Sequence, residues 1–391
     1  MEPIQVVNEQ ALVDFTKKLI RTPSPSGQEE QIAKRIAMEM KKVGFDQILI
    51  DKKHNVLGIL EGLGRGRDLL FLAHSDHADV GRMEDPYSGK EIDGAIFGEK
   101  GRVIYGRGAC DMKGALASMV YAADAINQSN KRLKGNLMVL VFTLEEQGIG
   151  EGLEFAVKNW ELSADMATSG EATDLNVYIG HRGSMQFKIT TKGRTCHASN
   201  PLRGINAIFQ MNKILNHLQT AYKLPNHPFL GDATFTVLDI KAEPGGFTPI
   251  VPDRCEIILD RRFFPNETQK MLENELWAII HTIQEEDPEF EAEIELHKVS
   301  RPLLCDPEAE IVKVLQEARQ QILDTPSKLG AWRFGIDVFT IEDAGIPCAG
   351  LGPGNELYAH SPQDHVAIED LVAATKIYAT SAAEICTSDT R

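Results

Sequence analysis

The sequence lacks any apolar run long enough to cross a membrane. None of its 391 residues falls in a stretch that approaches the roughly 20 consecutive apolar residues a bilayer requires. The chain begins Met1-Glu2-Pro3-Ile4, without a basic stretch followed by an apolar block, so we expect no signal peptide. Internal repeats and low-complexity tracts are also missing. We therefore expect a globular chain without a membrane partner.

Positive charge is scarce relative to negative charge. Lys and Arg number 41 against 57 Asp and Glu, which gives a formal net charge of -16. Binding to a phosphate backbone needs clustered cations, so this balance argues against nucleic acid as a partner. Surface solubility accounts for the bulk of the acidity. A site rich in carboxylate ligands would account for a small share.

Paired cysteine motifs are absent as well. No two of the six cysteines form a Cys-x-x-Cys pair, so neither a zinc ribbon nor a dithiol motif is indicated. A reduced, cytoplasmic chain is the simplest interpretation. The six are Cys110, Cys196, Cys255, Cys305, Cys348 and Cys386.

Short apolar runs alternate with helical patterns at both ends of the chain. This alternation predicts an α/β sheet with a mostly parallel core. In the first part we expect helices over 12–19, 32–40 and 115–126 and strands over 48–50, 56–60, 69–73 and 137–143. In the last part we expect a helix over 311–322, a strand over 346–351 and a helix from Ala367 onward.

The middle of the chain has the order β-α-β-β-α-β, which is typical of a ferredoxin-like unit. Such a unit forms a second domain inserted into the first. We therefore predict one domain of residues 1–182 and 297–391, interrupted by another of residues 183–296. The expected elements are strands over 185–191, 233–240, 255–263 and 291–296 and helices over 205–221 and 267–283.

Histidines and carboxylates lie at or just after predicted strand ends, or in adjoining loops. Ligands of open α/β sheets gather at the carboxyl ends of strands. A zinc site needs imidazole and carboxylate donors, and a two-metal site also needs a shared carboxylate. The sequence supplies such a set in His74 with Asp76, Asp111, Glu145-Glu146, Glu171 and His360.

Each of these motifs alone has an ordinary structural explanation. A lone His-x-Asp is usually structural, and residues 106–114 are compatible with a mere glycine-rich turn. Adjacent glutamates such as Glu145-Glu146 are usually solvated. Here, however, they end the apolar run 137–142, where two carboxylates are costly to desolvate unless they are paired or metal-bound.

Five motifs occur together in a particular order. They are Ala73-His74-Ser75-Asp76, Gly106-Arg107-Gly108 with Asp111-Met112-Lys113-Gly114, Glu145-Glu146, Ser169-Gly170-Glu171, and Gly352-Pro353-Gly354 with Ala359-His360. Over nearly the whole chain, this order resembles the zinc-dependent aminoacylase and carboxypeptidase family. That family includes acetylornithine deacetylase, succinyl-diaminopimelate desuccinylase and glutamate carboxypeptidase. The resemblance implies a catalytic metal-binding domain interrupted by a ferredoxin-like lid that often dimerises, so we expect a homodimer.

The resemblance also implies a ligand set. It assigns His74 and Glu171 to one metal and Glu146 and His360 to the other, with Asp111 as the bridge. Two divalent ions are expected. Zinc fits these donors best, and cobalt or manganese would also fit.

Two further roles follow from the same resemblance. Asp76 would orient His74 through the distal nitrogen of its ring. Glu145 would be the general base that takes a proton from the metal-activated water and passes it to the leaving nitrogen.

Substrate contacts are implied mainly in the inserted domain. His197 would cross from a partner subunit to steady the oxyanion of the tetrahedral intermediate. Asn206 and Arg262 match positions that grip a substrate carboxylate, for which the planar fork of arginine is suited. A surface salt bridge or a helix cap is the structural alternative for these three residues. Gly354 completes the predicted substrate-binding set.

The chain departs from the family pattern near the expected pocket. Ala172 stands where a proline is usual, and His365 stands where a glutamate is usual. His77 follows Asp76 where a small or hydrophobic residue is more common, and residues 332–337 resemble a less characterised branch. These departures leave the ligand set intact. Because they lie near the expected pocket, no single family substrate is transferred to this chain.

We therefore expect hydrolysis of an amide bond in a small carboxylate-bearing substrate, such as an N-acyl amino acid or a dipeptide. A decarbamoylase or aminohydrolase using the same metals is the alternative. What fills the acyl side of the pocket would distinguish them, and the sequence does not show it. A second alternative, a catalytically silent ligand-binding dimer, predicts a missing ligand or base, yet every position is filled.

Overall fold

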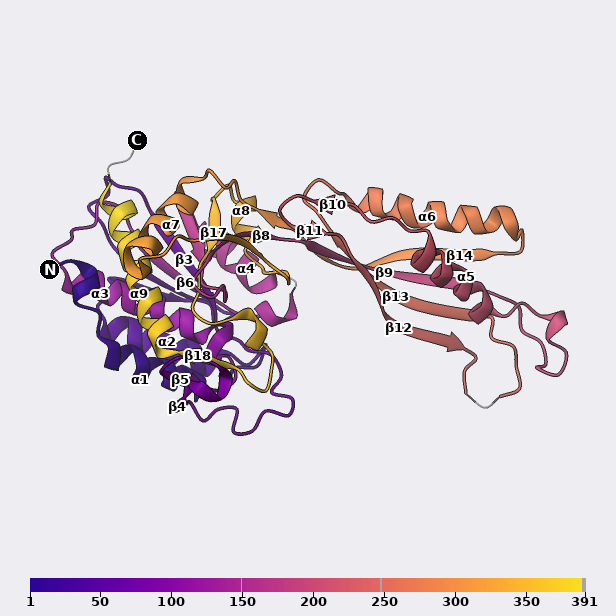
Figure 1. Cartoon of the computed structure of the whole chain (residues 1–391), viewed down its shortest axis with the longest axis horizontal. Coiled ribbons are helices and arrows are strands. Elements are labelled where there is room, and N and C mark those ends of the chain that lie inside the picture. Colours follow the sequence, from indigo (N-terminus) through magenta and orange to yellow (C-terminus); the bar gives the residue numbers. More distant parts are fainter. Residues whose placement is uncertain (149, 247, 389–391) are drawn as a thin grey trace. The chain divides into compact units, whose positions relative to one another are not determined.

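The computed structural model describes residues 1–148, 150–246 and 248–388, which form two units. The first comprises residues 1–180, 304–332 and the described residues from Ile336 onward. The second comprises His181–Leu303 and Arg333–Gly335. It is somewhat longer than the predicted domain of residues 183–296, because its last strand continues to Ser300 instead of ending near Leu296. Figure 1 labels the elements of both units.

A mixed sheet forms the centre of the first unit, and the predicted α/β class is confirmed. The four inner strands β6, β3, β7 and β17 run parallel, whereas β1, β2 and β8 pair antiparallel. Among the described residues the sheet has nine strands. In spatial order they are β1 (Gln47–Ile50), β2 (Val56–Leu60), β6 (Leu137–Phe142), β3 (Leu69–His74), β7 (Met166–Ser169), β17 (Cys348–Gly350), β8 (Val177–His181) and β15 (Leu303–Leu304), and β16 (Leu329–Trp332) pairs with β8.

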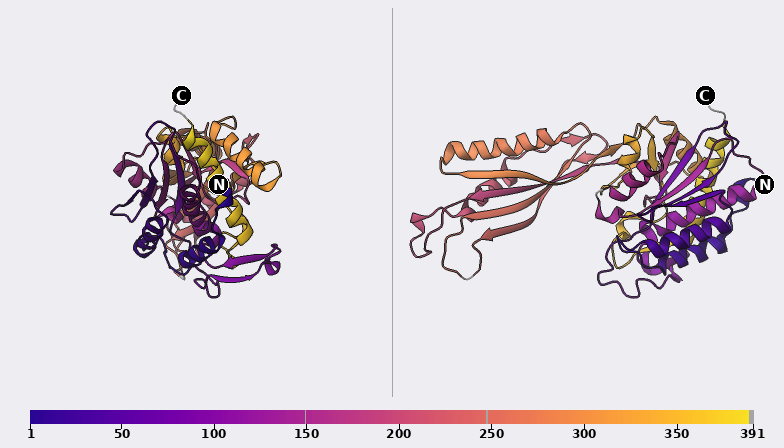
Figure 2. Two further views of the ribbon diagram at one scale, coloured as in Figure 1. Left: turned by 90° about the vertical axis from the view of Figure 1, so that its left-hand side faces the viewer. Right: turned by 180° about the vertical axis from the view of Figure 1, so that it is seen from behind.

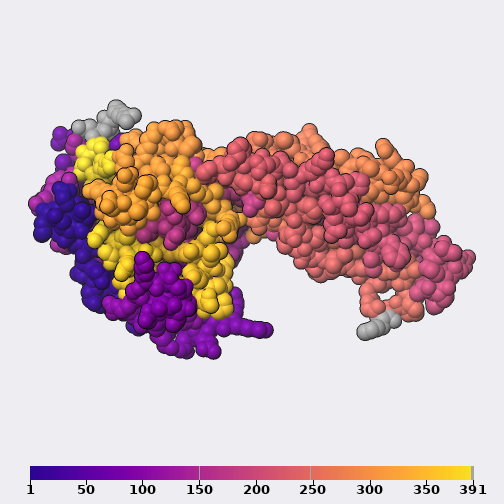
Figure 3. All heavy atoms as spheres, in the orientation of Figure 1, coloured from indigo at the N-terminus to yellow at the C-terminus, as the bar shows by residue number. Residues whose placement is uncertain are grey.

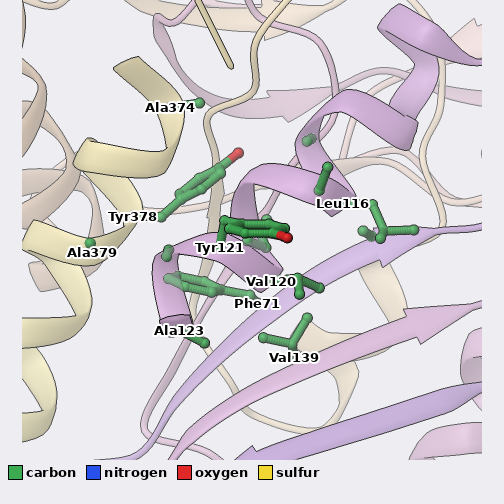
Figure 4. Packing of buried hydrophobic residues seen from close by; sticks show 14 of the residues in the cluster. Phe71, Leu116, Val120, Tyr121, Ala123, Val139, Ala374, Tyr378 and Ala379 are labelled. Atoms are coloured by element: carbon green, nitrogen blue, oxygen red, sulfur yellow. The ribbon is translucent and has the colours of Figure 1, made fainter. Parts of the chain in front are cut away.

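Helices bury the inner strands. Every residue of β3 and β6 is buried, which explains why both read as unbroken apolar runs. Phe71 of β3 lies against Tyr378 of α9 with ring centroids 5.2 Å apart (Figure 4). Burial of a side chain such as Phe71 stabilises the fold by roughly 1.5–3 kcal/mol. The helices are α1 (Glu9–Ile20), α2 (Glu30–Lys42), α3 (Gly114–Gln128), α4 (Glu151–Asn159), α7 (Glu310–Leu323), α8 (Phe339–Asp343) and α9 (Ile368–Thr387).

A second, small sheet of the first unit was not predicted. Its strands are β4 (Lys90–Asp93), β5 (Arg102–Tyr105) and β18 (His365–Ala367), with β5 in the middle and both pairings antiparallel. The segment of residues 90–105 and the C-terminal part of the chain therefore lie side by side, as the purple and yellow atoms of Figure 3 show.

The second unit has the predicted β-α-β-β-α-β order. Its antiparallel sheet has the spatial order β12-β13-β9-β14, and α5 and α6 contribute to one apolar core with it (Figure 2). A short hairpin of β10 (Asn226–His227) and β11 (Gly231–Asp232) precedes β12. The main elements are β9 (Gly183–Lys192), α5 (Ala207–Thr220), β12 (Phe235–Glu243), β13 (Arg254–Phe263), α6 (Gln269–Glu286) and β14 (Glu291–Ser300). Within the described part of the chain, no helix combines the length and apolarity that crossing a bilayer requires.

Candidate metal centre

Three neighbouring parallel strands carry predicted ligands at one edge of the sheet. His74 is the last residue of β3 and pairs with Phe142, the last residue of β6. The Glu145-Glu146 pair follows β6 after a short turn. Glu171 follows β7, whose Ser169 pairs with Leu72 of β3. Because the carboxyl ends of parallel strands meet at one edge, residues distant in sequence come together there.

Asp111 lies between two histidines. It belongs to the short turn Ala109–Lys113 that precedes α3. One carboxylate oxygen, Oδ1, is 3.0 Å from His74 Nε2, and the other, Oδ2, is 3.1 Å from His360 Nε2. One oxygen for each imidazole is the arrangement that a bridging carboxylate needs.

Each histidine also has a glutamate beside it. Glu146 Oε2 is 2.8 Å from His360 Nε2, and Glu171 Oε1 is 3.5 Å from His74 Nε2. The ligand atoms of His74, Asp111 and Glu146 lie within 4.8 Å of one another, as do those of His74, Glu145 and Glu171. All five predicted ligands thus lie together with Glu145, although their assignment as ligands remains a prediction.

The charge of this cluster is unbalanced without a cation. Four carboxylates, those of Asp111, Glu145, Glu146 and Glu171, surround two imidazoles, and none of the four forms an ion pair with a described Lys or Arg. Burial raises the pKa of Glu171 to about 8, assisted by the charge of Asp111. Hydrogen bonds to Asp111 and Glu146 raise the pKa of His360 to about 10. Protons thus offset the excess negative charge.

This donor set fits divalent cations. Imidazole nitrogens and carboxylate oxygens are the ligands that zinc and related ions take in proteins. Such ligands must lose their protons on metal binding, so cations would replace the protons that the cluster otherwise holds.

Asp76 contacts His74 differently from the expectation. The shortest contact of His74 Nδ1 is with the main-chain oxygen of Asp76, at 3.1 Å, whereas the Asp76 carboxylate lies 3.5 Å away. That carboxylate instead accepts hydrogen bonds from the main-chain N–H groups of Glu145 (3.2 Å) and Glu146 (3.1 Å) and from the Ser26 hydroxyl (2.7 Å). Asp76 therefore fixes both the His74 ring and the glutamate turn.

Three buried supporting residues were missed by the sequence analysis. Glu29 accepts a hydrogen bond from the main-chain N–H of Leu144, 3.2 Å away, directly before Glu145. Arg107 and Asp364 form an ion pair beside the Asp111 turn. Arg107 stood within a motif already noted, and Asp364 directly precedes His365, but no spacing rule links positions so far apart in the chain.

His77 and His365, the two histidines that depart from the family pattern, are not part of the ligand cluster. His77 Nε2 accepts a hydrogen bond from the main-chain N–H of Ser24 (3.0 Å), and its Nδ1 is 2.8 Å from the carbonyl oxygen of Ala78. His365 is buried and stacks on Phe97, with ring centroids 4.2 Å apart. Both side chains are accommodated by local packing and hydrogen bonds.

Two other departures from the family pattern also have local partners. The carbonyl oxygen of Ala172 accepts a hydrogen bond from the Trp332 indole, 3.2 Å away. Asp337, in the stretch that resembles a less characterised branch, accepts one from the main-chain N–H of Gly150 at 3.1 Å. Both contacts lie beside segments that carry predicted site residues, Glu171 in the first case and Glu145-Glu146 in the second.

Gly354 occupies a tight place beside the Asp111 turn. Its φ is +86°, and a Cβ there would lie 3.0 Å from Cys110 Sγ. A glycine is therefore required by the backbone, whatever its part in substrate binding.

The remaining three predicted residues belong to the second unit. Exposed His197 lies 2.7 Å from the Ser199 hydroxyl through Nδ1. Asn206 caps α5 by accepting a hydrogen bond from the N–H of Ile208 (2.9 Å), and Arg262 Nε donates to Asp260 (2.8 Å). The structural alternatives considered for Asn206 and Arg262, a cap and an ion pair, are thus both present.

His197 and Arg262 lie at opposite ends of the sheet of the second unit. Arg262 pairs with Ser184 near the start of β9, whereas His197 follows Lys192 at its end. Ser184 and Lys192 are eight residues apart, roughly 26 Å at about 3.3 Å per residue. Asn206 lies at the same end of the sheet as His197, because Arg194 and Ile205 pair there in an isolated antiparallel β-bridge.

Known proteins resemble this chain in sequence and in fold. Escherichia coli YgeY is 32% identical over 96% of each chain. Acetylornithine deacetylase of Myxococcus xanthus is 28% identical, over 86% of this chain and 85% of that protein. The solved aminopeptidase PepT of Bacillus cereus has a TM-score of 0.78 at 19% identity, over 97% of this chain and 99% of that chain.

A further solved structure, Bacillus subtilis YxeP, is described as a dinuclear metal-binding peptidase from the M20 family. Its TM-score is 0.75 at 18% identity, and the match covers 97% of this chain and 99% of that chain. The family model Peptidase family M20/M25/M40 matches residues 70–384, which include every predicted metal ligand. The chain therefore belongs to peptidase family M20/M25/M40 and is a metal-dependent hydrolase.

Proposed function

We propose that this protein is a two-metal hydrolase that cleaves an amide bond next to a carboxylate in a small substrate, an N-acyl amino acid or a dipeptide. The observation that carries the proposal is Asp111, which offers one oxygen to His74 and the other to His360. Relatives named acetylornithine deacetylase and succinyl-diaminopimelate desuccinylase support this substrate class.

The proposed ligands divide into two groups around Asp111. His74 and Glu171 would hold one cation, and Glu146 and His360 the other. We propose zinc as the native metal, with cobalt or manganese as substitutes. Two bound cations would lower the pKa of water and polarise the scissile carbonyl group.

Glu145 is the proposed general base. It is buried beside the ligands, and its main-chain N–H is held by Asp76. Burial, together with the nearby carboxylates of Glu171 and Asp337, raises the pKa of Glu145 well above its usual range. A carboxylate of raised pKa takes a proton from the attacking water more readily and can return it to the leaving nitrogen.

The experiment is hydrolysis of a panel of N-acetyl, N-succinyl and N-carbamoyl amino acids and of dipeptides by the zinc- or cobalt-loaded protein. We expect Glu145→Gln to lower kcat by about 10²–10⁴-fold while two cations remain bound. Glu151→Gln, at the start of α4, is the matched control and should keep full activity.

Each outcome distinguishes the candidates. Preference for N-carbamoyl substrates would favour the decarbamoylase alternative. Two bound cations without turnover of any substrate would favour the silent binding protein. Full activity of Glu145→Gln would show that Glu145 is not the general base.

We also propose that the second unit is a lid that forms a homodimer. β12 is an edge strand of its sheet, and Leu238 and Ile240 on it are 54% and 52% exposed. An exposed apolar edge strand is a template for pairing with another chain. Light scattering after size exclusion should give twice the 43.3 kDa of the chain, and a monomer at every concentration would contradict the proposal.

A reducing compartment, the cytoplasm, is the proposed location. All six cysteines are free, and five of them are buried. Fractionation of the source cells would test this, and recovery of the protein outside the cytoplasm would contradict it.

A further inference from the structure

Asp364 is a buried carboxylate that holds the turn of Asp111. Its Oδ2 accepts a hydrogen bond from the main-chain N–H of Gly108 (2.6 Å), and its Oδ1 accepts one from that of Cys110 (2.9 Å). The Asp364 side chain is fully buried. Because Cys110 directly precedes Asp111, Asp364 fixes the backbone one residue before the proposed bridging ligand.

The small sheet explains why Asp364 reaches this turn. His365 of β18 lies opposite Tyr105 of β5, and the next main-chain bond runs from Gly106 N–H to the Asp364 carbonyl oxygen (3.1 Å). β5 leads directly into the Asp111 turn, and β18 directly follows the loop of His360. The pairing of β5 with β18 (Figure 1) therefore brings the two ligand-bearing segments together.

Arg107 extends this contact to His360. Its Nη1 donates to Asp364 Oδ2 at 3.2 Å, and its Nη2 donates to the carbonyl oxygen of His360 at 3.4 Å. The Arg107 side chain is almost fully buried, whereas that of His360 is 55% exposed. The φ of His360 is +58°, a conformation that persists at a non-glycine residue only where its surroundings hold it. Because more than half of the His360 side chain is exposed, packing alone does not fix this residue, and the hydrogen bond from Arg107 holds its backbone.

We propose that Asp364 and Arg107 are a positioning pair that sets the separation of Asp111 and His360. The pair would thereby determine the affinity of the cation held by Asp111, Glu146 and His360. This inference rests on the two-cation site proposed above. Both cations share Asp111, but Arg107 also donates to the carbonyl oxygen of His360, which belongs to one cation alone. Among the described residues, no hydrogen bond of Asp364 or Arg107 reaches His74 or Glu171, so the other cation should depend on the pair much less.

The test is Co²⁺ binding to the full-length, metal-free protein, followed by visible absorption and calorimetry. The wild type should bind two Co²⁺ ions. In Asp364→Asn we expect the affinity for one ion to fall by about 10–100-fold, the range typical for loss of a residue that positions metal ligands. The affinity for the other ion should stay within about threefold. Arg107→Lys keeps the charge but lacks the planar fork, and should weaken the same ion.

Variants of His360 identify which ion is affected. His360→Ala should retain one Co²⁺, and adding Asp364→Asn to His360→Ala should not weaken that remaining ion further. Glu39→Gln is the matched control, because Glu39 is also a buried carboxylate, bound to the Tyr121 hydroxyl at 2.7 Å. It should alter stability without changing either Co²⁺ affinity.

The outcomes separate this inference from the proposed function. A wild type that does not bind two Co²⁺ ions would overturn the two-cation site and the inference with it. A wild type that binds two, with Asp364→Asn weakening neither or both equally, would overturn the positioning pair alone. Should Asp364→Asn fail to fold by circular dichroism, Arg107→Lys decides by the same criteria.

Discussion

His77 is held in one protonation state by its surroundings. Its Nε2 accepts a hydrogen bond from Ser24 N–H, so the ring proton is on Nδ1, which donates to the Ala78 carbonyl. Burial and the nearby cation of Lys113 lower the pKa of His77 to about 4. The unfolded chain has the ordinary value of about 6.5. The stability that His77 contributes is therefore present above pH 6.5 and is lost as the pH falls towards 4.

This titration predicts a difference between the wild type and His77→Gln. Between pH 7 and pH 5, the free energy of unfolding of the wild type should fall by roughly 2 kcal/mol more than that of the variant. Urea denaturation of the metal-free proteins at the two pH values measures it. Equal losses in both proteins would show that His77 does not carry the effect.

Gly354 is a position where a single methyl group should disturb the Asp111 turn. An added Cβ would meet Cys110 Sγ at 3.0 Å, and the φ of +86° is unfavourable for alanine. Gly345 has a similar φ of +78°, but a Cβ added there would meet nothing within 4 Å among the described residues. The two glycines therefore separate backbone strain from steric contact.

We predict that Gly354→Ala destabilises the protein more than Gly345→Ala does. Gly345→Ala should cost about 1 kcal/mol from backbone strain alone, and Gly354→Ala about 1–3 kcal/mol more. Cys110→Ala added to Gly354→Ala should recover part of the difference, because it removes the contacting sulfur. Thermal unfolding of the four proteins gives the values, and equal losses for the two glycine variants would contradict the steric explanation.

At the scale of elements, long and strongly patterned segments were predictable. The buried strands β3 and β6 have unbroken apolar runs, and α1 repeats apolar residues at helical spacing. The strands of the small sheet are only three or four residues long, and two of them, β4 and β5, are partly exposed. Periodicity cannot be recognised over so few residues. The pairing of β5 with β18 therefore could not be predicted from the sequence.

The same limit explains what was missed around the candidate site. His74 and Glu145 follow predicted strands, so their convergence could be inferred from a general rule for α/β sheets. The four-residue strand β7 before Glu171 was not among the predicted strands. The partners of Asp76 are main-chain N–H groups, and those of Asp364 depend on the small sheet. Main-chain donors leave no signature in residue type, because nearly every residue carries one.

Asn206 begins α5, and this explains why the helix starts at Ala207 although apolar spacing predicted a start at 205. Its side-chain oxygen accepts the N–H of Ile208, which is a cap that aspartate can also form. We predict that Asn206→Ala lowers the free energy of unfolding by about 1 kcal/mol, whereas Asn206→Asp leaves it nearly unchanged.

The aspartate variant then separates capping from substrate binding. If Asn206 also grips a substrate carboxylate, as the family resemblance implies, Asn206→Asp should raise KM through repulsion between two negative charges while stability is retained. Urea denaturation and steady-state kinetics on the same preparations provide both values. A KM equal to that of the wild type would leave Asn206 as a cap alone.

At the scale of the whole molecule, the main point is that His197 and Arg262 lie at opposite ends of the sheet of the second unit. The two ends of β9 beside which they lie are roughly 26 Å apart, and a small amide substrate is much shorter than that. A single substrate could contact both residues only if they came from different chains. In the dimer proposed above, His197 would then serve the site of the partner, as the family resemblance implies, and Arg262 that of its own chain.

Subunit mixing tests this arrangement. Dimers of His197→Ala with Glu145→Ala would contain one site with an intact Glu145 and an intact His197 from the partner. A random mixture should regain about one quarter of wild-type activity, since half of its dimers are mixed and each has one complete site. Arg262→Ala mixed with Glu145→Ala is the matched control. It should regain none, because neither site then combines Glu145 and Arg262 of one chain. Absence of recovery in the first mixture, with exchange proven by differently tagged subunits, would place His197 outside the partner's site.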